Sequence, residues 1–217
     1  SPIFSSGANY GGCYKVVGSD LYFAGRNSTQ HPYNEHNLWV YSTANDTSWL
    51  ASSEVEEPGL KGGFQLIGDT LFFDANNETH YGAIGTNLWA YGISNNTTWG
   101  IANKNGENPF LKQIHWGVYS SGGLFQTIDT ALYFTAVNSA DTTSNEYVWI
   151  YETTNESLWK PDGFDKDVGA TGAILLVGDI LYYDSTGDGI GTNGADDGQE
   201  MWAFNSFNGT NWMLADV

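Results

Sequence analysis

Pairs of tryptophan ten residues apart recur four times along this chain and constrain its fold more than any other feature. The pairs are Trp39/Trp49, Trp89/Trp99, Trp149/Trp159 and Trp202/Trp212. In each copy an Asn-x-Ser/Thr sequon begins four residues before the second tryptophan, at Asn45, Asn95, Asn155 and Asn208. Eight of the nine tryptophans belong to this pattern. The pattern therefore indicates four copies of one structural unit with a period of about fifty residues.

Each copy carries further shared elements upstream of its first tryptophan. One or two glycines precede a short apolar run, then a turn, then a Leu-aromatic-aromatic triplet. The triplets begin at Leu21, Leu71, Leu132 and Leu181. The apolar runs are rich in aromatic and β-branched residues and are bounded by Gly, Asp, Asn and Ser, so each run predicts a short strand. Their apolar residues are consecutive, which indicates strands that are covered on both faces.

Four antiparallel strands in each unit, covered by neighbouring units, predict an all-β, four-bladed β-propeller. A linear solenoid of four units and a β-sandwich are the alternatives. No segment of the sequence shows helical periodicity with caps. We expect a single repeat domain, because 217 residues can bury a substantial core without requiring two different domains. The units fall at approximately 1–51, 52–102, 103–162 and 163–217.

The first-tryptophan runs resemble the E-L-W-x-x-D-G-T type of repeat, also called hyalin-like. The resemblance is clearest at Glu200-Met201-Trp202-Ala203-Phe204, and Asn37–Tyr41 and Asn87–Tyr91 are similar to it. Only the fourth copy keeps the Glu, and a sequon replaces the D-G-T portion. Repeats of this family, about fifty residues long, occur in secreted and surface proteins of aquatic microbes. The resemblance implies an extracellular or cell-surface, propeller-like array and no particular enzyme activity.

N-glycosylation sequons are the strongest chemical signal in the chain. Seven occur, at Asn27, Asn45, Asn77, Asn95, Asn96, Asn155 and Asn208. Asn, Ser and Thr are all common in turns. That preference explains an Asn at a turn position, but not a Ser or Thr two residues later in all four copies. The phased sequons therefore predict attached N-linked glycans.

An acidic, glycine-rich loop in the fourth unit is a candidate calcium site, and calcium is the cofactor we expect. Its predicted ligands are Asp184, Asp188, Asn193, Asp196, Asp197 and Glu200. Oxygen ligands on a flexible loop suit Ca²⁺, although their spacing does not match the EF-hand loop. A solvated acidic loop is the alternative. The same loop contains a formal G-x-G-x-x-G at 189–194, but the acidic residues after it would repel a phosphate, so we reject nucleotide binding.

The balance of charges excludes several classes of partner. Twenty-five Asp plus Glu against seven Lys plus Arg give a formal net charge of −18. A chain of this charge does not suit nucleic acid, whose phosphates need a basic surface, or anionic membranes. No apolar run approaches the length of a membrane span, so we expect no transmembrane segment.

The sequence contains few signals of catalysis, and we expect that this chain is not an enzyme. The motifs G-x-S-x-G and H-E-x-x-H are absent, and the four histidines have no companion cysteines at zinc-site spacing. Three hypotheses follow. The first is a structural protein of a surface layer or fibre. The second is a module for calcium-dependent adhesion or carbohydrate binding, favoured by the aromatic insertion 115–119. The third and least favoured is a propeller glycosidase or lyase.

Self-association into a homopolymer is the partner prediction that goes with the structural hypothesis. The segment 1–10 has no charged side chain. We expect the segment Ser1–Tyr10 to pair with Trp212–Leu214 of the next copy by strand addition. The alternative is that Ser1–Phe4 folds back on its own fourth unit and leaves a monomer.

Overall fold

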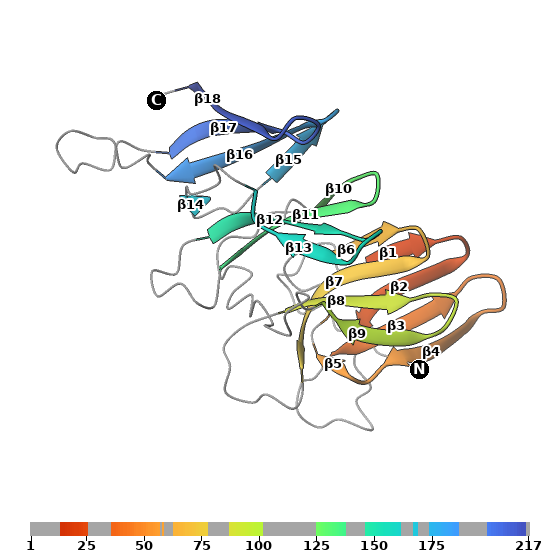
Figure 1. Ribbon diagram of the computed structural model, residues 1–217. Coiled ribbons are helices and arrows are strands. Elements are labelled where there is room, and N and C mark those ends of the chain that lie inside the picture. Colours follow the sequence, from red (N-terminus) through yellow and green to blue (C-terminus); the bar gives the residue numbers. More distant parts are fainter. Residues whose placement is uncertain are drawn as a thin grey trace. The chain divides into compact units, whose positions relative to one another are not determined.

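The computed structural model describes residues 14–25, 36–56, 58, 63–77, 87–101, 125–137, 146–161, 167–168, 174–186 and 199–215. These residues form eighteen strands, and none of them lies in a helix, which confirms the predicted all-β class. Within these ranges no helix is long and apolar enough to cross a membrane. The chain divides into two compact units, Ser1–Ile101 and Ala102–Val217, and each is described here by itself (Figure 1).

The first unit holds two antiparallel sheets, which are the first two blades. The first blade has the order β1-β2-β3-β4. Its strands are β1 (Tyr14–Val17), β2 (Asp20–Gly25), β3 (Asn37–Ser42) and β4 (Thr47–Ser52). In the second blade β5 and β6 both pair with β7, which is followed by β8 and β9. These strands are β5 (Val55–Glu56), β6 (Phe64–Ile67), β7 (Thr70–Asn77), β8 (Asn87–Gly92) and β9 (Thr97–Gly100).

The second unit repeats this arrangement. The third blade has the order β10-β11-β12-β13. Its strands are β10 (Phe125–Ile128), β11 (Ala131–Val137), β12 (Glu146–Glu152) and β13 (Ser157–Trp159). In the fourth blade β14 and β15 both pair with β16, followed by β17 and β18. These strands are β14 (Asp167–Val168), β15 (Ile174–Val177), β16 (Ile180–Thr186), β17 (Gln199–Asn205) and β18 (Thr210–Ala215).

The sheets within each unit pack face to face, and they do so the same way in both units. In the first unit Tyr22, Leu38 and Val40 of the first blade share a core cluster with the second blade's Leu71 and Phe73. The second unit uses the corresponding positions. There Tyr133, Val148 and Ile150 of the third blade cluster with Leu181 and Tyr183 of the fourth.

Each blade therefore has two distinct faces. We call the face with the residues equivalent to Tyr22 and Val40 the forward face, and the opposite one the rear face. In both units the forward face of one blade packs against the rear face of the next. Polar groups support this packing, because Gln126 Nε2 donates a hydrogen bond to the Ile174 carbonyl (3.3 Å). The inner strands, such as β3, are buried on both faces, which agrees with their consecutive apolar residues. The outermost strands β4 and β9 are largely exposed, so the expectation of cover on both faces is wrong for them.

Candidate functional site

The four phased sequons occupy the same hairpin turn in all four blades. The turns cover residues 43–46, 93–96, 153–156 and 206–209, and each connects the third strand of its blade to the outermost strand. The sequon asparagines Asn45, Asn95, Asn155 and Asn208 are exposed in every copy. The repeat thus places four chemically identical side chains at equivalent surface positions.

The side-chain oxygen of each sequon asparagine accepts a hydrogen bond from the Ser or Thr two residues later. Asn95 Oδ1 accepts from the Thr97 amide (3.1 Å) and hydroxyl (2.7 Å). Asn208 Oδ1 accepts from the same two groups of Thr210, at 3.0 and 2.6 Å. The Asn45 oxygen accepts from the Thr47 hydroxyl, and that of Asn155 from the Ser157 amide.

These bonds have two consequences for the sequons. The Ser or Thr has a turn-stabilising role of its own, which the sequence reasoning missed. The amide nitrogens of the four asparagines, in contrast, donate no hydrogen bond to any residue that the structure describes.

Asn96, which belongs to an overlapping sequon, has a different role from its neighbour Asn95. It occupies the left-handed position that ends the turn, with φ 53°. The equivalent residues Asp46, Glu156 and Gly209 also have positive φ. The side-chain oxygen of Asn96 accepts a hydrogen bond from Tyr91 Oη (2.7 Å), as Asp46 does from Tyr41 Oη (2.8 Å). The bond to Asp46 raises the pKa of Tyr41.

The sequon turn lies beside the first hairpin turn of its blade, at one end of the sheet. The Thr43 amide donates to the Ser19 carbonyl (2.9 Å) in the first blade, and Ile93 donates to Asp69 (3.0 Å) in the second. Equivalent bonds join the two turns in the third and fourth blades. Asn77 is the last residue of β7 and so lies at the opposite end of its blade. Asn27 lies outside the described residues.

The two tryptophans of each pair have different surroundings. The first lies on the third strand, where Trp39 and Trp89 are each only 8% exposed. The second lies on the outermost strand, and all four of these residues have nearly the same exposure. We call them the outer tryptophans: Trp49 (38%), Trp99 (38%), Trp159 (40%) and Trp212 (37%).

Two of the predicted calcium ligands lie on neighbouring strands of the fourth blade. Asp184 on β16 and Glu200 on β17 lie on opposite faces of the sheet, since Asp184 pairs with Met201 and Glu200 with Ser185, so the strands do not bring these two carboxylates together. The other four, Asp188, Asn193, Asp196 and Asp197, lie outside the described residues. Glu200 is 5% exposed, and its Oε2 atom is buried without a hydrogen-bond partner among the described residues. In that part of the chain no three His, Cys, Asp or Glu side chains gather as metal ligands would.

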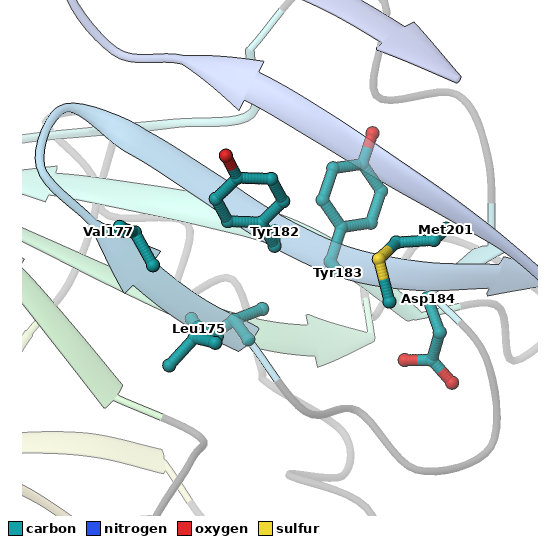
Figure 2. Close-up of a pocket in the computed structure, with 7 residues that line it drawn as sticks. Leu175, Val177, Tyr182, Tyr183, Asp184 and Met201 are labelled. Atoms are coloured by element: carbon teal, nitrogen blue, oxygen red, sulfur yellow. The ribbon is translucent and has the colours of Figure 1, made fainter. Parts of the chain in front are cut away.

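The forward face of the fourth blade carries an apolar hollow of about 550 Å³. Figure 2 shows Leu175, Val177, Tyr182 and Met201 around it, with Asp184 at the side of Met201. Leu175, Val177 and Met201, which line the hollow, are 60%, 56% and 53% exposed. The aromatic insertion 115–119, on which the carbohydrate-binding hypothesis drew, lies outside the described residues.

Comparisons with known proteins bear on the fold alone. No family model matches the chain, and no curated protein sequence does. Among solved structures, the chain is similar to the β-propeller domain of the Trilobed protease from Pyrococcus furiosus, at 10% identity and a TM-score of 0.53. That match covers 94% of this chain and 56% of the other.

Two further structures are similar at the same level. A puromycin-hydrolyzing peptidase from Mycobacterium tuberculosis is 12% identical with a TM-score of 0.52, over 90% of this chain and 26% of that one. A puromycin hydrolase is 10% identical with a TM-score of 0.56, over 92% and 28%. The chain thus spans well under two thirds of the length of these three proteins. The likenesses and the four repeated sheets confirm the prediction of a β-propeller fold.

Proposed function

We propose that this chain is an extracellular, N-glycosylated structural protein whose copies assemble into a cell-surface layer or fibre. The observation that carries the proposal is the repetition of one exposed sequon turn in all four blades. A catalytic or ligand-binding site needs one distinctive constellation of side chains. A feature repeated in every structural unit suits a surface that is modified or packed uniformly.

The faces of the blades support assembly of copies. Inside the chain, a forward face packs on a rear face twice. The forward face of the fourth blade carries apolar side chains, with Leu175 and Val177 60% and 56% exposed. On the rear face of the first blade Tyr14 and Val16 are 62% and 59% exposed. The fourth blade of one copy therefore suits the first blade of the next, by the packing already used within each unit.

Such a contact joins two different surfaces and so generates an open array of copies. We favour this face-to-face packing over the strand addition expected from the sequence. The two faces belong to the described residues, whereas the segment Ser1–Tyr10 lies outside them. The net charge of −18 opposes assembly by repulsion. Salt or bound calcium would weaken that repulsion, and we expect assembly to strengthen with ionic strength.

A single charged substitution tests the assembly. In Leu175→Asp, a carboxylate replaces an apolar side chain at the proposed contact. We expect negative-stain images to show assemblies for wild type and monomers for this variant. Met213→Asp is the matched control, because Met213 is 44% exposed on the same blade but lies on its rear side, paired with Trp202. Equal assembly of wild type and Leu175→Asp, or monomers for all three proteins, would reject the proposal.

Calcium-dependent adhesion is the second candidate function, and the buried Glu200 carboxylate favours it. A carboxylate oxygen without a hydrogen-bond partner is costly to bury, and a cation would offset that cost. Calcium that binds only the folded chain raises its melting temperature. We expect such a rise in the wild type and its loss in Glu200→Gln. A melting temperature that calcium and chelator leave unchanged would remove this candidate.

A further inference from the structure

The sequon and the outer tryptophan form one composite motif, Asn-x-Ser/Thr-x-Trp, in all four blades. Side chains at alternate positions of a strand lie on the same face. Thr47 and Trp49 therefore share one face of β4, and the Thr47 hydroxyl is hydrogen-bonded to Asn45. The second and fourth copies have the same hydroxyl bond, from Thr97 to Asn95 and from Thr210 to Asn208, whereas in the third copy the Ser157 amide donates to Asn155. In each motif the asparagine thus lies in the turn, and the Ser or Thr and the tryptophan lie on one face of the outermost strand.

The outer tryptophans stay partly exposed even where another blade of the same unit packs on their forward face. Trp49 pairs with Val40 and Trp159 with Ile150, on forward faces that pack against the next blade of their unit. Trp212 pairs with Ala203, on the forward face of the fourth blade. Yet their exposed fractions are 38%, 40% and 37%. Packing between the blades of a unit thus leaves the indoles of Trp49 and Trp159 partly in water.

A sugar attached to the sequon has the chemistry to cover this indole. A pyranose ring presents a flat face of C–H groups beside its hydroxyls, which suits the negative face of an aromatic ring. Four residues of extended chain span at most about 13 Å, at roughly 3.3 Å per residue. A short oligosaccharide reaches that far. The hydrogen bond from the Ser or Thr to Oδ1 fixes the orientation of the side-chain amide and so the direction in which the first sugar leaves the turn.

We propose that each outer tryptophan is the platform on which the glycan of the asparagine four residues earlier packs. The inference rests on the glycosylation in the proposed function and adds the surface that the glycan occupies. A glycan held in this way runs along the outermost strand of its blade. Outermost strands expose unpaired backbone groups that favour edge-to-edge aggregation. A packed glycan shields those groups, so the platform also directs contacts between copies to the faces of the blades.

Thermal unfolding of the full chain, made in a host that adds N-glycans, tests the platform. Each protein is melted before and after enzymatic removal of its glycans. Deglycosylation should lower the melting temperature of both wild type and Trp49→Ala, but we expect the fall to be about 2 °C smaller in Trp49→Ala. In that variant the glycan at Asn45 has no indole to pack on, so its removal costs no such contact. Leu50→Ala is the matched control. Leu50 is 39% exposed on the same strand but points to the opposite face, and its change on deglycosylation should equal that of wild type.

A second readout needs no substitution. In NMR spectra of the glycosylated wild type, sugar protons stacked on an indole shift upfield, and the shift disappears on unfolding. Mass analysis of the peptide that contains Asn45 separates the two levels of the account. An unmodified Asn45 overturns both the proposed glycosylation and the platform. An occupied Asn45 with equal melting changes in all three proteins, and with no upfield shift, overturns the platform alone.

Discussion

In the first two blades, the two tryptophans of a pair are the same residue in similarly apolar strands, yet the first is buried and the second is exposed. Trp149 and Trp202, the first tryptophans of the other two blades, are partly buried. Trp89 on the third strand of its blade is 8% exposed, and Trp99 on the outermost strand is 38% exposed. They also lie on opposite faces, since Trp89 pairs with Phe73 and Trp99 with Ala90. The comparison teaches that one repeated residue type has two roles. The inner tryptophan supports the fold, and the outer one belongs to the surface.

The largest effect on stability is expected when the two tryptophans of the second blade are truncated to alanine, one at a time. Trp89→Ala removes a buried indole and should lower the free energy of unfolding by about 3–5 kcal/mol. Trp99→Ala removes a partly exposed indole and should lower it by about 1 kcal/mol in protein without glycans. Urea unfolding of both variants measures the difference. Equal losses would show that the two positions do not differ as their burial indicates.

A pair of glycine substitutions probes the same contrast through packing. A Cβ on Gly25 would lie 2.7 Å from Trp39 Cδ1 and 2.8 Å from Phe23 Cε2, so Gly25→Ala must displace buried rings. We expect a loss of about 1–3 kcal/mol. Gly100→Ala is the control on an outermost strand, because its Cβ would meet Trp89 only at 3.9 Å. Urea unfolding should find the control within about 0.5 kcal/mol of wild type.

Alkaline pH should destabilise the fold through the buried tyrosines of its inner strands. Burial, with smaller contributions from Tyr91, Asp20 and Asp69, raises the pKa of Tyr22 from 10.0 to about 12. Burial also raises the pKa of Tyr183. When the pKa of a group is higher in the folded state than in the unfolded state, its contribution to stability is fully present below the unfolded-state pKa. That contribution is lost as the pH rises through the folded-state pKa. We therefore expect stability to fall between about pH 10 and 12. Unfolding in urea against pH measures the fall, and Tyr22→Phe should reduce it.

The smallest effect concerns the two adjacent asparagines of the second blade. Asn96→Gly relieves a positive φ of 53° and loses the bond from Tyr91, so these effects oppose one another. We expect a net change within about 0.5 kcal/mol, and a loss of about 1–2 kcal/mol for Asn96→Val. Asn96→Gly also keeps the sequon at Asn95 and reproduces the Asn-Gly-Thr of the fourth blade. A lost glycan at Asn95 in this variant would contradict the separate roles of the two residues.

Much of this architecture could be predicted from the sequence because the same order of apolar runs and turn residues recurs in four copies. Apolar runs between turn residues located the strands of each blade, and the common sequon located one turn. The different exposure of the two tryptophans could not be predicted. Leu38-Trp39-Val40 and Trp49-Leu50-Ala51 are similar runs, and only their place in the sheet decides which is buried. The short strands β5 and β14 were missed for a related reason, since two residues in a polar connection carry no periodicity.

The roles within the sequon turn show a second limit. Overlapping sequons made Asn95 and Asn96 equivalent as patterns, although only Asn96 has a positive φ. Gly209 at the corresponding position of the fourth blade was the available signal for a left-handed residue. The calcium prediction depends on side chains of a loop between β16 and β17. Of its predicted ligands the described residues include only Asp184 and Glu200, so it remains a prediction.

Mapping of glycans on the protein made in a glycosylating host tests the central claim most directly. Peptides from the intact protein are analysed by mass for each sequon separately. The account predicts glycans at Asn45, at Asn95 or Asn96, at Asn155 and at Asn208, each in the same exposed turn. Unmodified peptides at the four turn positions would contradict the account, because the repeated turn would then have only the structural role that its hydrogen bonds provide.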